Sequence, residues 1–254
     1  DYIIAADTDA GISRESNQDS VMLKTFHTTL GKMAFGVLCD GLGGLAKGEL
    51  ASASVVRAFD AWAMRHLPGL CVTGLQDGII RREWEDLLSE QNRKIKEYGR
   101  KNGVNLGTTV VVILLTEDRY YILNIGDSRV YELSDHIEQL TSDQTYVNRE
   151  VSQGNMTLEE AASDPRRNIL LQCVGASDKI YPEMYFGETK KNTVYLLCSD
   201  GFRHEITKEE IYDRLCPENS RSQEQMTENC RKLIALNMER EEQDNITVGL
   251  IRTF

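Results

Sequence analysis

The sequence predicts an α+β fold in which antiparallel β-sheet is covered by helices on its outer side. Apolar runs of strand length, rich in Val, Ile and Tyr, recur along the chain and are bounded by Gly or Asp. Most connections between these runs are short, which favours antiparallel pairing. Strands and helices also cluster instead of alternating strictly, a pattern typical of helices packed outside an antiparallel sheet.

The predicted strands extend from the first residues of the chain to the last. Their apolar runs lie at residues 2–6, 33–39, 110–115, 120–125, 130–133, 194–198 and 246–251. Residues 49–67 and 75–100 show long helical patterns, each with its apolar side chains on one side. Two later helices are predicted at residues 208–215 and 223–236, and Thr207 with Glu210 forms a capping-box sequence at the start of the first.

The composition predicts one ordinary globular domain over residues 1–254, since the chain has 4 prolines and no linker-like tract. The net charge of −11 argues against nucleic acid or an anionic membrane as a partner, because both bind cationic surfaces. No apolar run approaches the roughly 20 residues that span a bilayer. The 6 cysteines form no Cys-x-x-Cys pair and several lie in apolar runs, which predicts free thiols in a reducing cytoplasm.

Three acidic residues stand at the ends of predicted strands. Asp40 follows the strand at 33–39 and precedes Gly41, Asp200 follows the strand at 194–198, and Asp244 shortly precedes the last strand. An aspartate followed by glycine is most often simply a turn. Carboxylates held at the ends of buried strands can instead converge on hard cations such as Mg²⁺ and Mn²⁺, which prefer oxygen ligands.

Further short segments favour the cation-binding interpretation. In chain order they are Arg-Glu-Ser-Asn-Gln-Asp at 14–19, Asp-Gly-Leu-Gly-Gly at 40–44, Gly-Thr-Thr at 107–109, Gly-Asp-Ser-Arg at 126–129, Cys-Ser-Asp-Gly at 198–201 and Asp-Asn-Ile-Thr-Val at 244–248. Each motif alone is weak. In this order and spacing the set resembles the metal-dependent type 2C family of Ser/Thr protein phosphatases in its bacterial form, over essentially the whole chain.

The resemblance implies a four-layer αββα sandwich, in which two antiparallel β-sheets are flanked by helices and metals bind at one end. It implies two Mn²⁺ or Mg²⁺ ions, bridged by Asp40, with the carbonyl of Gly41 on one ion and with Asp200 and Asp244 completing the other. Asp127 matches the residue that helps to bind a third, weaker ion. The implied reaction is the hydrolysis of phosphoserine and phosphothreonine in proteins by a water molecule that bridges two metal ions.

Two further residues receive roles from the same resemblance. Arg14 matches the residue that grips the substrate phosphate, for which the planar guanidinium fork is well suited. Asp19 matches an acid that holds metal-bound water and, with Arg14 and Asp40, completes the implied catalytic set. The implied partners are phosphorylated proteins, targets of a Ser/Thr kinase, and the implied enzyme is a monomer.

The chain departs from the family pattern at two places where relatives often carry histidine. Leu45 follows the Asp-Gly-x-Gly-Gly stretch, and Asp164 precedes Pro165 in the flap, residues 143–168, where residues 157–161 predict a short capped helix. The proton donor to the leaving group is therefore unassigned. Asp164 suits that role only if its pKa is raised, and an ordinary turn aspartate is the simpler interpretation.

Two other interpretations of these residues compete with the phosphatase. Residues 41–46 fit a dinucleotide-binding fingerprint, but the βαβ alternation of that fold is lacking and the other motifs would be unexplained. The stronger alternative is a catalytically silent phosphatase fold that serves as a regulatory or binding module. Loss of a metal-binding aspartate would be typical of such a module, and all the matching aspartates are present.

Overall fold

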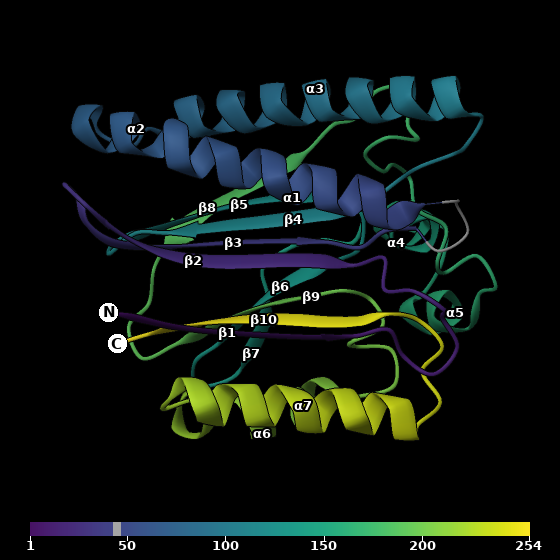
Figure 1. Cartoon of the computed structure of the whole chain (residues 1–254). Helices are drawn as coiled ribbons and strands as arrows, with labels where there is room; N and C mark the ends of the chain where they lie inside the picture. The colour runs from purple at the N-terminus through teal and green to yellow at the C-terminus, as the bar shows by residue number, and fades with distance from the viewer. Residues whose placement is uncertain (43–46) are drawn as a thin grey trace.

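Two five-stranded antiparallel sheets form the centre of the computed structural model, which describes residues 1–42 and 47–254 (Figure 1). The first sheet has the order β1 (Tyr2–Asp9), β10 (Ile246–Thr253), β9 (Val194–Cys198), β6 (Arg129–Leu133) and β7 (Ile137–Gln139). The second has the order β2 (Ser20–Thr28), β3 (Gly31–Cys39), β4 (Val110–Leu115), β5 (Arg119–Ile125) and β8 (Glu183–Glu188).

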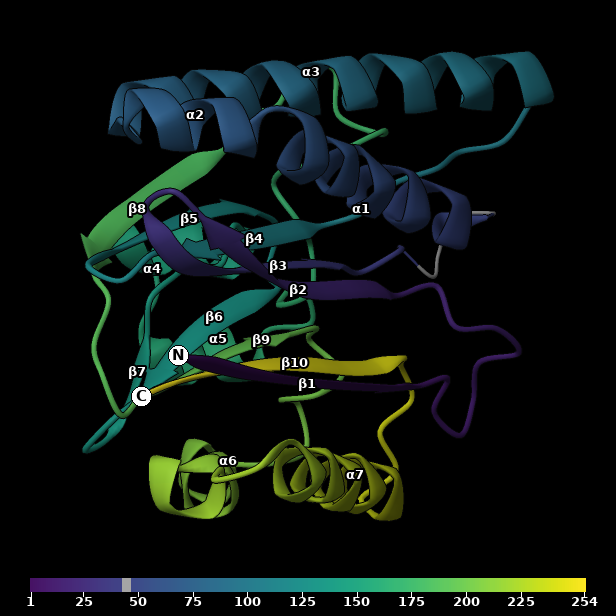
Figure 2. The ribbon, with the colours of Figure 1, turned by 60° about the vertical axis from the view of Figure 1, so that its left-hand side comes forward.

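Helices cover the outer face of each sheet. Over the second sheet lie α1 (Gly48–Arg65), α2 (Leu67–Thr73) and α3 (Asp77–Asn102), and over the first lie α6 (Lys208–Leu215) and α7 (Gln223–Glu239), with the short 3₁₀ helix η1 (Pro217–Asn219) between them (Figures 1 and 2). The short helices α4 (Tyr146–Ser152) and α5 (Leu158–Ser163) lie at the end of the sandwich opposite the chain termini. The predicted four-layer αββα sandwich is confirmed.

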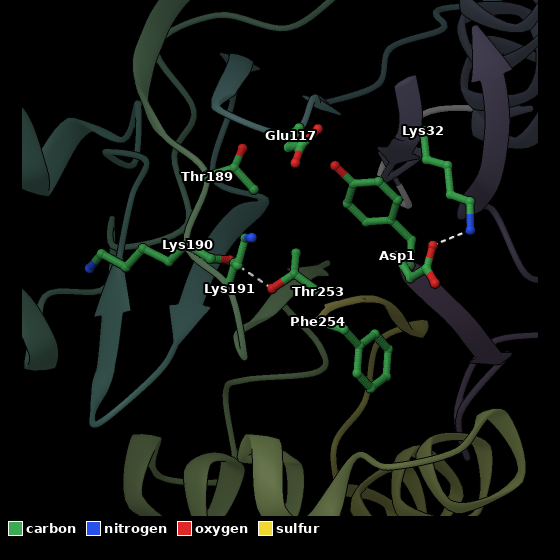
Figure 3. Close-up of a pocket in the computed structure, with 9 residues that line it drawn as sticks. Asp1, Lys32, Glu117, Thr189, Lys190, Lys191, Thr253 and Phe254 are labelled. Atoms are coloured by element: carbon green, nitrogen blue, oxygen red, sulfur yellow. Dashed lines mark hydrogen bonds and ion pairs between the residues drawn. The ribbon is translucent and has the colours of Figure 1, made fainter. Parts of the chain in front are cut away.

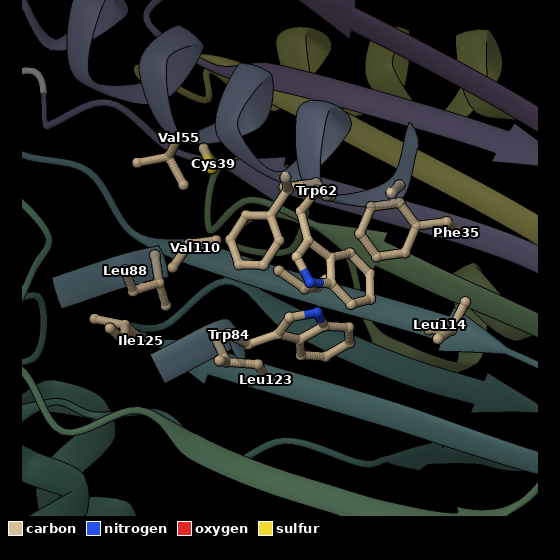
Figure 4. Packing of buried hydrophobic residues seen from close by; sticks show 14 of the residues in the cluster. Phe35, Cys39, Val55, Trp62, Trp84, Leu88, Val110, Leu114, Leu123 and Ile125 are labelled. Carbon is tan, nitrogen blue, oxygen red and sulfur yellow. The ribbon is translucent and has the colours of Figure 1, made fainter. Parts of the chain in front are cut away.

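Three apolar layers hold these four structural layers together. Along β3, Phe35 and Val37 pack under α1 and α3, while Ala34 and Leu38 point between the sheets. Both faces of this strand are therefore buried, which explains why its sequence is continuously apolar. Figure 4 shows the centre of the outer layer, where the rings of Trp62 and Trp84 meet edge to face with centroids 5.4 Å apart.

The predicted strands and helices all occur, with shifts at their ends. The helix predicted at 49–67 ends at Arg65, because Pro68, near the start of α2, has no amide hydrogen with which to continue the helical hydrogen bonds of α1. Strands β2, β7 and β8 and helices α2 and α4 were not predicted, since their sequences are short or mix polar with apolar residues. In the described part of the chain, no helix combines the length and apolar composition needed to cross a bilayer.

Candidate active site

The predicted acidic residues meet at one end of the sandwich because strands of both sheets end or begin there. Asp40 directly follows β3, and Asp19 directly precedes β2. Asp127 lies in the turn from β5 to β6, Asp200 lies two residues after β9, and Asp244 lies two residues before β10. This is the end that carries α4 and α5, opposite the N- and C-termini (Figure 1).

The carboxylates are close enough to repel one another. Burial raises the pKa of Asp40 well above its ordinary value, and the charges of Asp19, Asp200, Asp127 and Asp244 raise it further. Burial, followed by the charge of Asp200, raises the pKa of Asp127 to about 7. Burial raises the pKa of Asp19 to about 7 as well, against a hydrogen bond that favours its ionised form. An acidic cluster of this kind costs free energy unless positive charge balances it.

The backbone at Asp40 is fixed by the Gly-Thr-Thr segment. The amide of Asp40 donates to Thr109 Oγ1 at 3.1 Å, and its carbonyl accepts from the Thr109 amide and the Thr108 hydroxyl, both at 2.9 Å. Gly41 pairs with Thr108 in an isolated β-bridge and donates its amide to the Gln18 carbonyl at 3.2 Å. A Cβ at Gly41 would clash with the Gln18 carbonyl. Only glycine therefore lets the chain at residue 41 lie this close to Gln18 and Thr108.

The loop between β1 and β2 is held in place by one buried side chain. The amide nitrogen of Asn245 donates to the carbonyls of Ala10 and Ser16, at 2.9 and 3.1 Å. Its amide oxygen accepts from the backbone of Gln18 at 2.9 Å. Asn245 therefore ties the two ends of this loop to the start of β10, and the loop carries Arg14 to the edge of the acidic cluster.

Arg14 faces Asp244 with two parallel hydrogen bonds. Its Nε lies 3.0 Å from Asp244 Oδ1 and its Nη2 lies 2.9 Å from Oδ2. These hydrogen bonds, with the charges of Asp40 and Asp200, raise the pKa of the Arg14 guanidinium despite partial burial. The predicted phosphate-binding arginine and a predicted metal ligand are thus in direct contact, and about a third of each side chain remains exposed.

Two carboxylate oxygens of the cluster are buried and have no hydrogen-bond partner among the described residues. Asp19 accepts from the Thr247 hydroxyl at 2.6 Å through Oδ2, which leaves Oδ1 unpaired. Asp200 directs Oδ2 toward His204 Nε2, 3.6 Å away, and its Oδ1 is unpaired. A buried oxygen without a hydrogen-bond partner costs free energy, and such an oxygen is a suitable ligand for a hard divalent cation. The residues present therefore fit such a cation.

The side chains do not form a closed metal site as they stand. Across residues 1–42 and 47–254, no three His, Cys, Asp or Glu side chains are arranged to hold a metal ion together. Both oxygens of Asp244 are bound by Arg14. The site combines an acidic cluster with an arginine that competes for one of its members.

Beside the cluster, a cavity of about 400 Å³ separates the sheets from the flap helices α4 and α5. Arg203 lines this cavity, and its Nη2 donates to the Asp127 carbonyl at 3.0 Å and lies 3.7 Å from Asp127 Oδ2. The same nitrogen lies 3.6 Å from Asp143, which also binds Arg129 through two hydrogen bonds of 2.7 and 2.6 Å. Asp127 therefore lies between the acidic cluster and this pair of arginines.

A second cavity, of about 240 Å³, lies at the opposite end between the chain termini (Figure 3). None of the predicted site residues lines it. Of its lysines, Lys32 pairs with Asp1, and Lys190 binds Glu132 at 2.6 Å. Since none of the predicted site residues lies here, we place the chemistry at the acidic end.

The flap contains the predicted capped helix and Asp164, the candidate proton donor. The predicted capped helix is confirmed as α5, with reciprocal hydrogen bonds between Thr157 and Glu160. Hydrogen bonds from Arg166 lower the pKa of Asp164 to about 2, so this carboxyl is ionised near neutral pH and is unsuited to donate a proton. Leu45 and the glycines at 43 and 44 lie outside the described residues.

Two residues of the site were not predicted from the sequence. His204 lies beside Asp200, and its Nδ1 is 3.4 Å from Oε2 of Glu242. Burial opposes the charged imidazole, but Glu242 and the charge of Asp200 raise the pKa of His204 overall. The sequence did carry a signal, because only 4 histidines occur and this one closely follows the Asp-Gly pair at 200–201.

Comparison with known proteins identifies the family of the chain. The family model for protein phosphatase 2C matches residues 11–237. The serine/threonine protein phosphatase PstP of Mycobacterium tuberculosis is 31% identical over 250 residues, which is 96% of this chain. The chain spans 43% of the length of that relative. The chain belongs to the protein phosphatase 2C family.

Solved structures agree with this assignment. The serine/threonine phosphatase of S. agalactiae is 28% identical, with a TM-score of 0.85 and complete coverage of both chains. The catalytic domain of PstP in complex with two manganese ions is also 28% identical, with a TM-score of 0.77. That alignment covers 99% of this chain and 97% of the other. The sandwich described above is thus the fold of bacterial phosphatases of this family.

Proposed function

We propose that residues 1–254 form a single catalytic domain that hydrolyses phosphoserine and phosphothreonine in proteins with the help of Mn²⁺ or Mg²⁺. The observation that carries this proposal is the cluster of carboxylates at the strand ends. They repel one another, and two of them present buried oxygens without a partner among the described residues. The family relationship supplies the reaction class, since the relatives matched above are named serine/threonine phosphatases.

The metal-binding roles follow the positions of the acids. Asp40, with the carbonyl of Gly41, and Asp200 with Asp244 would hold two ions, and Asp127 would contribute to a third, weaker one. When bound, a pair of divalent cations lowers the pKa of a water molecule so that hydroxide is present near neutral pH. The complex of the related PstP domain with two manganese ions supports the proposal of the first two ions.

Arg14 and Asp19 have separate tasks in this proposal. Arg14 holds the substrate phosphate. Its guanidinium already binds the Asp244 carboxylate through two parallel hydrogen bonds, and it can bind two phosphate oxygens in the same way. Asp19, fixed through Oδ2 by Thr247, keeps Oδ1 directed into the cluster as an acceptor for a water proton. Phosphoproteins made by a Ser/Thr kinase are the proposed partners, with a monomeric enzyme acting on them in the cytoplasm.

The test is hydrolysis of a phosphothreonine peptide with Mn²⁺, with chelator, and with the variant Asp200→Asn. Metal-dependent release of phosphate that is lost in Asp200→Asn supports the proposal. The variant Asp135→Asn is a matched control, because Asp135 is exposed in the turn between β6 and β7. A wild-type protein that binds Mn²⁺ but releases no phosphate from any phosphopeptide would instead favour a silent binding module.

A further inference from the structure

His204 lies between two carboxylates that belong to different loops. Its Nε2 is 3.6 Å from Asp200 Oδ2, in the loop after β9. Its Nδ1 is 3.4 Å from Glu242 Oε2, in the segment before β10. About a quarter of the His204 side chain is exposed, against 6% for Glu242 and 15% for Asp200. The imidazole therefore joins a well-buried acid to a member of the acidic cluster.

Glu242 is itself anchored to the loop that carries Asp244. Its Oε1 accepts from the backbone amide of Gln243 at 2.8 Å and from that of Asp244 at 2.9 Å. One oxygen of Glu242 is thus committed to the Asp244 loop, while the other faces His204. Through these contacts, a single chain of groups connects the backbone of Asp244 with the carboxylate of Asp200.

The two loops also approach each other directly. A Cβ at Gly201 would clash with the carbonyl of Asn245, so the absence of a side chain lets the segments after Asp200 and after Asp244 touch. Close packing brings the backbones together, but it does not set the rotation of the Asp200 carboxylate. That rotation decides which oxygen enters the acidic cluster.

We propose that His204 and Glu242 form a brace that positions Asp200 and Asp244 as ligands of the same ion, an inference that rests on the proposed function. His204 engages Oδ2 of Asp200, so Oδ1 is the oxygen that stays buried and unpaired in the described structure. Partners that hold a metal-ligating side chain in orientation typically contribute 10–100-fold to metal affinity. In this proposal His204 and Glu242 are positioning residues, which act through Asp200 and Asp244.

The experiment measures Mn²⁺ binding by calorimetry, with MnCl₂ as the only ligand, for wild type, His204→Ala, His204→Gln, Glu242→Ala and the double alanine variant. We expect His204→Ala to weaken binding by about 10–100-fold. His204→Gln keeps a donor that reaches Asp200 and recovers most of that loss. Because both residues act through one contact chain, the double variant should be no weaker than the weaker single variant.

Two controls separate the brace from general stability. His136→Ala, in the exposed turn after β6, should bind Mn²⁺ like wild type. Melting temperatures in chelator report the effect of each substitution on the fold without metal. If His204→Ala does not fold, Glu242→Gln carries the test. It keeps the Oε1 acceptor for the Asp244 loop but replaces the Oε2 that faces His204 with an amide donor, so Mn²⁺ binding should weaken.

The outcomes distinguish this inference from the proposed function. Unchanged Mn²⁺ affinity in a folded His204→Ala overturns the brace, while the phosphatase proposal stands. Fully additive losses in the double variant also overturn it, because the two residues would then act separately. A wild-type protein that binds Mn²⁺ without hydrolysing phosphopeptides contradicts the proposed function alone. A wild-type protein that binds no Mn²⁺ overturns both.

Discussion

The Arg14 guanidinium holds both carboxylate oxygens of Asp244, with contacts of 3.0 and 2.9 Å. These residues are 230 positions apart in the chain, and Asn245 brings them together by fixing the loop between β1 and β2. The proposed phosphate-binding group and a proposed metal ligand therefore bind each other, so a cation at Asp244 would compete with Arg14 for these oxygens. A guanidinium released in this way would be free to bind a phosphate.

Substitution of Arg14 should therefore separate metal binding from catalysis. We expect Arg14→Ala to bind Mn²⁺ as well as wild type or up to about fivefold more tightly, since a partly exposed ion pair contributes up to about 1 kcal/mol. The same variant should lose at least about tenfold in kcat/KM for a phosphothreonine peptide, because charge-assisted bonds to the phosphate are removed. Calorimetry and steady-state kinetics check the two halves. Markedly weaker Mn²⁺ binding in Arg14→Ala would contradict this competition.

Neutralising Asp40 should stabilise the fold while removing activity. Burial and four neighbouring carboxylates oppose the charge on Asp40, so Asp40→Asn removes an unfavourable charge. In chelator, we expect the free energy of unfolding to rise, because a group whose charged form is disfavoured in the fold lowers stability near neutral pH. Phosphatase activity with Mn²⁺ should fall by about a thousandfold or more, because metal catalysis is worth several kcal/mol.

Denaturant unfolding and phosphate release measure these two effects on one preparation. Asp135→Asn, the exposed control, should change neither the stability nor the activity. A metal-free Asp40→Asn that is less stable than wild type would show that the carboxylate makes a favourable contact in the fold.

The acidic cluster also predicts how stability depends on pH in the absence of metal. Asp19 and Asp127 have ordinary pKa values of 3.8 and pKa values of about 7 in the fold. Between these values the folded protein keeps protons that the unfolded chain has released, so the free energy of unfolding falls as the pH rises. This loss levels off only as the pH passes above about 7, and Asp40 and His204, whose pKa values are also raised, contribute in the same direction. Asp143 and Glu242, whose pKa values are lowered, contribute in the opposite direction only below about pH 4.5.

Melting temperatures from about pH 5 to about pH 7.5, with chelator and with millimolar Mn²⁺, measure this dependence. In chelator the melting temperature should decrease across the range. With Mn²⁺ the decrease should be much smaller, because the cation binds only the folded state and balances the charges. Parallel curves with and without Mn²⁺ would show that the cation does not bind these carboxylates.

The sequence predicted much of this molecule because its central strands are continuously apolar. Val110–Leu115 and Val194–Cys198 were predicted with their observed bounds, since both faces of these strands are buried. Thr207 and Glu210 likewise marked the start of α6, because a capping box is a local contact. In contrast, β8 was missed because its sequence, Glu-Met-Tyr-Phe-Gly-Glu, lies at a sheet edge and stays partly exposed.

The site also contains residues that a local sequence pattern reveals and contacts that only the fold brings together. Asp40 and Asp200 were recognisable from the strand and glycine beside them. The contact between Glu242 and His204 was not, because it joins loops that only the pairing of β9 with β10 brings together. Nor did the sequence show that Arg14 faces Asp244. Such contacts depend on the register of strands distant in sequence, which no local pattern encodes.

A final prediction concerns Thr247, the residue that holds Asp19. The Thr247 hydroxyl donates to Asp19 Oδ2 at 2.6 Å and is itself fully buried. Thr247→Val keeps the shape but removes the donor, so Asp19 loses the hydrogen bond that fixes its Oδ2. We expect kcat to fall by about 10–100-fold, with little change in KM, while Thr247→Ser, which keeps the hydroxyl, retains most of the activity. Steady-state kinetics with a phosphothreonine peptide test both variants, and a Thr247→Val enzyme as fast as wild type would remove Asp19 orientation from the proposed mechanism.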